Sequence, residues 1–149
     1  MSDQFRAYRH GFPSLADDNH QITSPVDPTY NCIGHAAGTT RWWQPLPAVV
    51  PGGKPPFWPA GVPREETIDA FCMAYSALGY SDCSNGEFEK GYEKIAIFAK
   101  DGVPKHAARQ LDGNNWTSKL GRSVDISHSL HDVSGDFYGH VVRYMKRAK

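Results

Sequence analysis

The second half of the chain is a series of strand-like segments joined by short turns, and this pattern constrains the fold most strongly. Residues 93–100 place apolar side chains on both faces, which is typical of a central strand. Asp101-Gly102 is a turn signal, and residues 112–115 form a second one. The expected strands are residues 93–100, 106–111, 116–120 and 138–144, with a short element at 124–130. This order predicts an antiparallel meander.

The first half of the chain favours two helices. A short helix is expected from about Asn31 to Gly38, with Thr29 or Asn31 as its N-cap. A longer one is expected over residues 63–78, because apolar side chains recur there every three or four positions. The seven prolines of residues 45–63 exclude a regular helix or a central strand between them. Two helices followed by a meander predict an α+β fold.

Composition narrows the class of protein. A length of 149 residues predicts a single domain over 1–149, with residues 1–28 as an irregular, turn-rich arm. Sixteen basic and 16 acidic residues give zero formal charge, which argues against a nucleic-acid partner. No apolar run has the length of a signal peptide or a membrane span, and three cysteines do not form a disulfide framework. We therefore expect a cytoplasmic protein without a membrane partner; the oligomeric state stays open.

Cys32 is the strongest candidate for chemistry. It lies where the first helix is expected to begin, and the exposed amides and dipole of a helix N-terminus favour a thiolate. Cys72 falls on the apolar stripe of the second helix, and Cys83 precedes a turn without a helix behind it. These two cysteines are expected to be structural.

His106, at the start of a predicted central strand, is expected to accept the proton of the Cys32 thiol. Asp125 is the preferred third group, because a carboxylate also stabilises the imidazolium; Ser118 and His128 are the alternatives. The expected site also includes a set of supporting residues. They are Asn31, with the Cys32 amide, as oxyanion donor, His35 as support for the thiolate, and Trp42, Trp43 and Trp58 as a substrate cleft that also fills the core.

A metal site is a weaker interpretation of the same residues. Cys32 and His35 form one closely spaced pair, and His106, His128 or His131 would have to complete it. The chain has no second pair with the spacing usual for zinc. We therefore expect neither a metal nor another cofactor.

Four segments resemble the papain-like superfamily of cysteine peptidases and amidases, including the NlpC/P60-type cell-wall amidases. They are the YNCI string at 30–33, EKIAIFA at 93–99, HAARQ at 106–110 and WTSKLG at 116–121. Together they look like a small bacterial family within or near that superfamily. The resemblance implies a papain-like fold, with an N-terminal helix carrying the nucleophile Cys32 packed on an antiparallel sheet carrying the base His106.

Two functional hypotheses follow from the sequence. The first is a cysteine-dependent hydrolase or acyl transferase that acts on an amide or isopeptide bond of a peptide, protein or peptidoglycan-like substrate, through a thioester on Cys32. The second is a non-catalytic binding module, or a partner of a toxin, that keeps the papain-like fold and binds through its Trp- and Pro-rich loop. The residues leave hydrolysis, deamidation and transamidation open.

Overall fold

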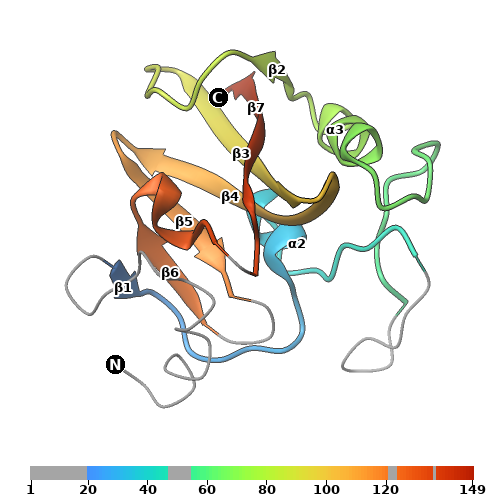
Figure 1. Ribbon diagram of the computed structural model, residues 1–149, viewed down its shortest axis with the longest axis horizontal. Coiled ribbons are helices and arrows are strands. Elements are labelled where there is room, and N and C mark those ends of the chain that lie inside the picture. Colours follow the sequence, from blue (N-terminus) through green and yellow to red (C-terminus); the bar gives the residue numbers. More distant parts are fainter. Residues whose placement is uncertain (1–19, 47–54, 121–123, 136) are drawn as a thin grey trace.

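A seven-stranded antiparallel sheet forms most of the computed structural model, which describes residues 20–46, 55–120, 124–135 and 137–149 (Figure 1). The order of the strands across the sheet is β1-β6-β5-β4-β3-β7-β2. Their bounds are β1 His20–Ile22, β2 Ser81–Cys83, β3 Tyr92–Lys100, β4 Val103–Asp112, β5 Asn115–Lys119, β6 Asp125–His128 and β7 His140–Ala148. The meander β3-β4-β5-β6 occupies the middle of this order, as the sequence predicts.

Helices contribute little to the described part of the chain. The α-helix α2 covers Cys32–Ala36, α3 covers Ile68–Ser76, and a 3-10 helix, η2, covers Leu130–Val133. The second helix begins later than its apolar pattern predicts, because the Thr67 side chain accepts a hydrogen bond from the Ala70 amide and caps the helix there. It ends before Gly79, whose φ of +94° stops the helix as expected.

The prediction of an α+β, papain-like architecture is wrong. The sheet dominates, and the two α-helices have only five and nine residues. Two edge strands were not predicted from the sequence: β1, inside the arm predicted to be irregular, and β2, which ends at Cys83, just before the expected turn. The last strand also continues to Ala148, beyond the predicted end at residue 144. Residues 1–19, the rest of the predicted arm, lie outside the described residues.

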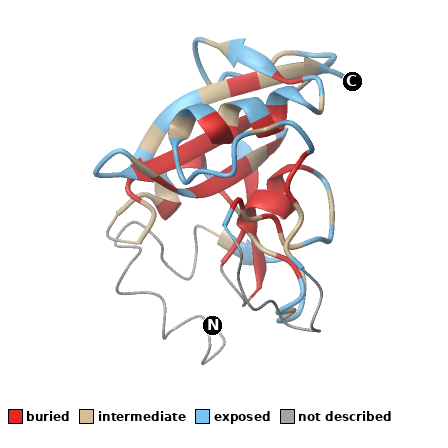
Figure 2. Ribbon diagram, turned by 90° about the vertical axis from the view of Figure 1, so that its right-hand side faces the viewer, coloured by how far each residue is buried: buried red, intermediate tan, exposed pale blue. Residues whose placement is uncertain are grey.

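The two faces of the sheet pack against different apolar layers. On the first face, α2, α3 and the segment with Trp43 and Trp58 cover Ile95 and Ile97 of β3. On the second face, η2 and the segment that follows it cover the side chains that alternate along the strands with those of the first face. The buried ones on strands β3 to β6 are Ala96, Phe98, Ala108, Trp116 and Ile126. Buried residues gather on the central strands, and the strands at one edge are more exposed (Figure 2). We call these the helix face and the far face.

Along β4, consecutive side chains point to opposite faces of the sheet. Ala107 packs with Cys32 and Ile33 on the helix face, whereas Ala108 packs with Phe98 and Trp116 on the far face. His106, one residue before Ala107, pairs with Phe98 across β3 and therefore belongs to the far face. This alternation decides which polar groups can meet.

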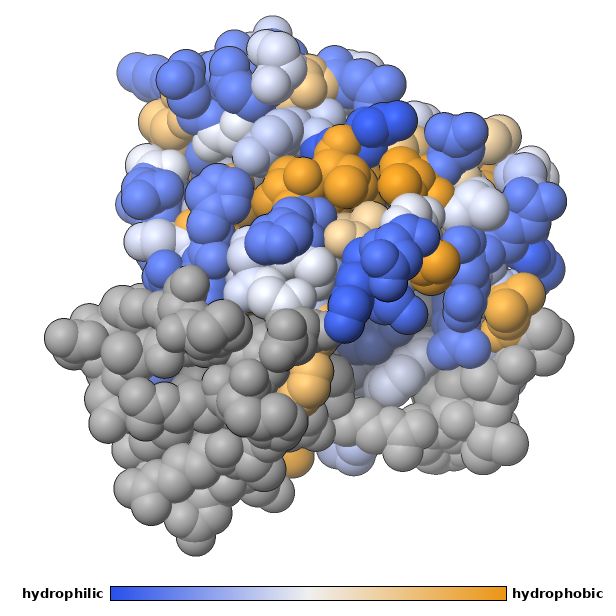
Figure 3. All heavy atoms as spheres, in the orientation of Figure 1, coloured by the Kyte–Doolittle hydropathy of each residue, from blue (hydrophilic) through white to orange (hydrophobic). Residues whose placement is uncertain are grey.

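Close packing holds α2 in place. A Cβ atom added to Gly34 would lie 1.9 Å from the Arg41 carbonyl oxygen, so only glycine permits the helix to approach this segment. The helix packs against β4 and β5 behind the sheet in Figure 1. In that view, hydrophilic side chains cover much of the surface of the described residues, and a band of apolar side chains crosses its upper half (Figure 3). No helix among the described residues is long and apolar enough to cross a membrane.

Candidate functional site

Asn31 fixes the start of α2 and so positions Cys32. Its Oδ1 atom accepts hydrogen bonds from the amides of Gly34 (3.2 Å) and Trp43 (3.0 Å), and its Nδ2 atom donates to the Trp43 carbonyl (2.7 Å). The predicted helix start and N-cap are therefore confirmed. The same contacts occupy the side-chain amide that the sequence analysis assigned to the oxyanion. The Asn31 side chain thus serves the helix and its neighbouring segment.

The Cys32 thiol is buried, with only 8% of the residue exposed. Burial raises the pKa of this thiol to about 11, although the amides of Ala107, Ile33 and Cys32 and the charge of Lys119 oppose the rise. Desolvation thus outweighs the effect of the helix N-terminus. At neutral pH the resting side chain is a protonated thiol, not the thiolate expected from the sequence.

The structure does not bring His106 to Cys32. The imidazole of His106 lies on the far face, where it stacks on Tyr138 with 3.8 Å between ring centroids and meets Phe98 edge to face. The thiol lies on the helix face beside Ala107. The backbone of β4 separates the two groups, so their predicted pairing has no support in this geometry.

His106 instead belongs to a buried chain of three polar side chains. Its Nε2 atom lies 2.9 Å from the Ser118 Oγ atom, and the same hydroxyl lies 2.7 Å from the Nε2 atom of His128. The Nδ1 atom of His128 lies 2.7 Å from the Ser129 carbonyl oxygen. Of the two alternatives considered for the third group, Ser118 thus contacts His106 directly and His128 contacts Ser118, away from Cys32.

The hydrogen bonds that join His106, Ser118 and His128 can be donated in only one direction. A carbonyl oxygen only accepts, so His128 carries its proton on Nδ1, and its Nε2 accepts from the Ser118 hydroxyl. The Ser118 oxygen must then accept from Nε2–H of His106. This leaves Nδ1 of His106 unprotonated, and that atom finds no hydrogen-bond partner among the described residues.

Both imidazoles of this chain are neutral at neutral pH. Burial, followed by the charges of His128 and His35, holds the pKa of His106 well below its usual range, and burial lowers the pKa of His128 to about 4. The Ser118 hydroxyl is fully buried. The three hydrogen-bonded side chains of His106, Ser118 and His128 therefore form a structural network, and none of them reaches solvent as a nucleophile would.

A second set of polar side chains surrounds α2 on the helix face; we call it the helix-face cluster. It consists of Tyr30, His35, Thr117, Lys119 and Asp125, next to Cys32. Asp125 Oδ2 accepts a hydrogen bond from the Tyr30 hydroxyl (2.6 Å) and lies 3.8 Å from Nδ1 of His35. Nε2 of His35 lies 2.9 Å from the Thr117 hydroxyl. The sheet thus brings Asp125 to His35, not to His106.

The charges of this cluster are largely withdrawn from water. Lys119 is fully buried; its Nζ donates to the Asp27 carbonyl (2.6 Å) and lies 4.6 Å from the centre of the Tyr30 ring. Burial lowers the pKa of both Lys119 and His35, and the Asp125 carboxylate opposes the fall in each case. The Asp125 Oδ1 atom is buried without a partner among the described residues. Perturbed, clustered ionisable groups of this kind are typical of functional sites.

The tryptophans expected at the cleft lie mostly inside the protein. Trp43 and Trp58 are 2% and 4% exposed and pack in the helix-face layer, where Trp43 contacts Phe57 and Trp58 contacts Phe71. Trp42 is partly buried and donates to the Gln44 side chain (3.1 Å). The core role foreseen for these residues is confirmed for Trp43 and Trp58. Residues 47–54 of the Pro-rich loop lie outside the described residues.

Sequence analysis missed Tyr30, Thr117 and Lys119. Strand alternation carried a signal for two of them, because Thr117 and Lys119 share one face of β5 while Trp116 and Ser118 share the other. A lysine on a buried strand is also unusual and demands a partner. Tyr30 offered no such pattern, since its contact with Asp125 joins residues far apart in the chain.

The fold and this site define a mostly β protein with a buried polar cluster beside a helix-capped cysteine. The chain belongs to a family of domains of unknown function, DUF7689, whose model matches residues 21–146. Neither the curated proteins nor the solved structures contain a match to it. Among the described residues, no group of three or more His, Cys, Asp or Glu side chains is arranged to hold a metal ion.

The buried histidines predict a loss of stability in mild acid. A group whose pKa is lower in the folded chain stabilises it above the ordinary value near 6.5, and this contribution is lost as the pH falls toward about 4. For His128 the loss is on the order of 3 kcal/mol. Chemical denaturation at pH 7 and pH 4 should show a smaller fall for His128→Gln than for wild type. An equal fall in the free energy of unfolding for His128→Gln and for the exposed-site control His140→Gln would contradict the conclusion that His128 is buried as a neutral imidazole.

Ser118→Ala is expected to lower the free energy of unfolding by about 2–4 kcal/mol. The substitution leaves Nε2–H of His106 and Nε2 of His128 buried without their shared partner. Chemical denaturation measures the change, and Ser84→Ala, at an exposed position, is the matched control with an expected effect below about 0.5 kcal/mol. Equal effects of the two substitutions would show that the Ser118 hydroxyl does not link His106 to His128.

Alkylation should reveal the protonated thiol. In a variant with Cys72 and Cys83 replaced by alanine, iodoacetamide should modify Cys32 slowly at pH 7, and the rate should climb with pH toward about 11. The denatured variant, in which the thiol is solvated, is the control and should react faster at pH 7. Rapid labelling of the folded variant at pH 6.5 is the result that this account cannot accommodate.

Proposed function

We propose that this protein is a cysteine-dependent hydrolase or acyl transferase that acts on an amide or isopeptide bond, with Cys32 as nucleophile and His35 as base. The observation that carries the proposal is the helix-face cluster. Cys32 and His35 lie three residues apart on α2, a spacing that puts two side chains on one side of a helix. Asp125 lies 3.8 Å from His35 Nδ1.

The orientation of His35 supports its role as the base. With Nδ1–H directed to the Asp125 carboxylate, Nε2 is the unprotonated nitrogen and can take a proton. In the resting protein this nitrogen lies 2.9 Å from the Thr117 hydroxyl. A rotation of the imidazole from Thr117 toward the thiol would place carboxylate, imidazole and nucleophile in sequence.

The reaction we propose starts from a neutral thiol. As Cys32 Sγ forms a bond to the substrate carbonyl carbon, its proton passes to Nε2 of His35. The C–N bond then breaks, and the same proton goes to the leaving amine, which leaves a thioester on Cys32. Water or an amine attacks the thioester and restores the thiol. The Lys119 charge, which favours the thiolate form of Cys32, would stabilise the negative charge as it develops.

The proposed substrates are peptides, proteins or peptidoglycan-like amides, and we propose the cytoplasm as the location because all three cysteines are free thiols. The proposed thioester chemistry is that of the papain-like hydrolases, whereas the fold of this chain is not theirs. The alternative of a binding module that uses its Trp- and Pro-rich loop has less support, since Trp43 and Trp58 are buried.

The test uses p-nitrophenyl acetate as a simple acyl donor, with release of p-nitrophenol and the intact mass of the protein as readouts. We expect one acetyl group on Cys32 and its loss in Cys32→Ala. His35→Gln should slow acetylation by roughly 10²–10⁴-fold, the usual contribution of a general base. His106→Gln, with its fold checked by circular dichroism, should retain the rate within a few-fold.

Two results would contradict the proposal. Acetylation that persists in Cys32→Ala would exclude Cys32 as the nucleophile. Loss of acetylation in a folded His106→Gln variant, together with an unchanged rate in His35→Gln, would return the base to His106.

A further inference from the structure

A hollow of about 370 Å³ opens where three loops meet beside the far face, away from Cys32. Its rim comes from the segment between β2 and β3 (residues 86–88), the turn between β4 and β5 (residues 113–114) and η2. These segments come together at the upper left of Figure 1. The volume is within the range of small-molecule sites.

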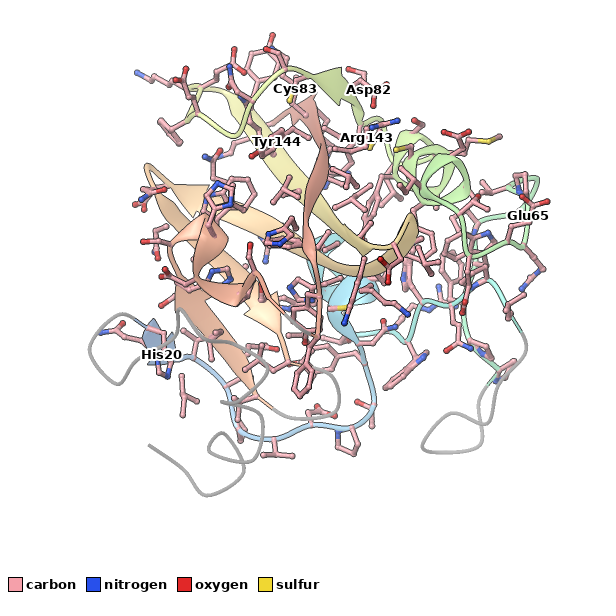
Figure 4. The ribbon with its side chains drawn as sticks, viewed as in Figure 1. His20, Glu65, Asp82, Cys83, Arg143 and Tyr144 are labelled. Carbon is pink, nitrogen blue, oxygen red and sulfur yellow. The ribbon has the colours of Figure 1, made fainter. Side chains whose placement is uncertain are left out.

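Three aromatic residues from three different elements line the hollow. Phe88 on the rim is 46% exposed, Tyr144 of β7 is partly buried, and Trp116 of β5 is 1% exposed and forms part of the base with Leu130. Tyr144 is paired with Cys83 of β2 and lies beside it in Figure 4. Gly86 packs between these rings: a Cβ atom there would lie 2.8 Å from Tyr144 and 3.1 Å from Trp116.

Buried polar contacts hold the rim of the hollow in position. Gln110, 6% exposed, donates from Nε2 to the carbonyls of Gly86 (2.8 Å) and Gly113 (3.1 Å), and so ties two of the three rim segments together. Lys94 donates to the Asn85 carbonyl (3.1 Å) and forms an ion pair with Glu89 (2.9 Å). The hollow is therefore built by specific contacts of buried side chains.

The lining of the hollow holds one carboxylate, that of Glu87, and one imidazole, that of His131. Glu87 is the acidic member of the lining, and within the described residues its side chain makes no hydrogen bond or ion pair. Nearby, the single carboxylate of Glu89 pairs with two ammonium groups, those of Lys94 (2.9 Å) and Lys146 (3.2 Å). Aromatic faces add a negative potential, and aromatic residues beside a carboxylate suit a desolvated organic cation.

We propose that this hollow binds a small organic ammonium ion, a quaternary or N-methylated amine, against Phe88, Tyr144 and Trp116 with Glu87 as counter-ion. The methyl groups would contact the rings, and the charge would be shared between the ring faces and the carboxylate. This binding site is independent of the thiol chemistry proposed for Cys32, because it lies by the other face of the sheet.

Binding is tested with choline and with 3,3-dimethylbutan-1-ol, a neutral molecule of the same shape, by calorimetry on the full chain. We expect choline to bind roughly tenfold more tightly than the alcohol, and its N-methyl protons to shift upfield in NMR spectra through the ring currents of the aromatic residues. A peptide carrying trimethyl-lysine, compared with free choline, distinguishes a protein-borne ligand from a free one.

Matched variants locate the site. Tyr144→Leu and Glu87→Gln should each weaken choline binding several-fold, whereas Tyr92→Leu, an exposed aromatic position outside the hollow, and Glu66→Gln, an exposed acidic one, should leave it unchanged. Equal affinity for choline and the neutral alcohol, or an absence of binding to either ammonium ligand in the folded protein, would overturn the proposal. Equal effects of Tyr144→Leu and Tyr92→Leu would place the ligand elsewhere and also overturn it.

Discussion

Alternation of side chains along β4 is the constraint on which both polar networks depend. His106 and Ala107 are neighbours in the chain, yet one faces Phe98 and Tyr138 while the other faces Cys32. A strand that is buried on both faces cannot exchange these sides, because a shift of one residue would move every side chain to the opposite layer. The position of the His106 imidazole, on the side of the sheet away from the thiol, follows from this alternation.

The two networks meet different physical requirements. On the far face, His106, Ser118 and His128 form a neutral chain in which each hydrogen bond fixes the next tautomer. On the helix face, charged groups gather around α2, and one carboxylate oxygen of Asp125 is left without a partner among the described residues. A neutral hydrogen-bonded network stabilises a fold even with one nitrogen, Nδ1 of His106, left without a partner among the described residues. Incompletely satisfied charges next to a nucleophile are what a reaction can use.

Local signals in the sequence predicted the helix cap and the central meander. The cap at Asn31, the turn at Asp101-Gly102 and the buried strand after residue 92 depend on near neighbours, so their patterns are visible in the chain. The edge strands β1 and β2 have three residues each and form only because β6 and β7 offer them hydrogen bonds. Nothing local distinguishes such segments from loops.

The side of the sheet that meets α2 was beyond sequence analysis for a similar reason. Ala107 and Ala108 follow His106, and because both are small and apolar, the pattern of β4 fits either orientation. The contact between Asp125 and His35 joins strand β6 to a helix near the other end of the chain. Only the three-dimensional packing of α2 on β4 and β5 makes that contact visible.

The most direct test of the central claim is the histidine ring ¹⁵N NMR spectrum of the wild-type protein and of Cys32→Ala at neutral pH. We expect His106 to be protonated on Nε2 and His128 on Nδ1, with both sets of signals unchanged by the substitution, while the His35 signals shift. A His106 signal that changes when the thiol is removed, with His35 unaffected, would contradict the account and put His106 beside Cys32.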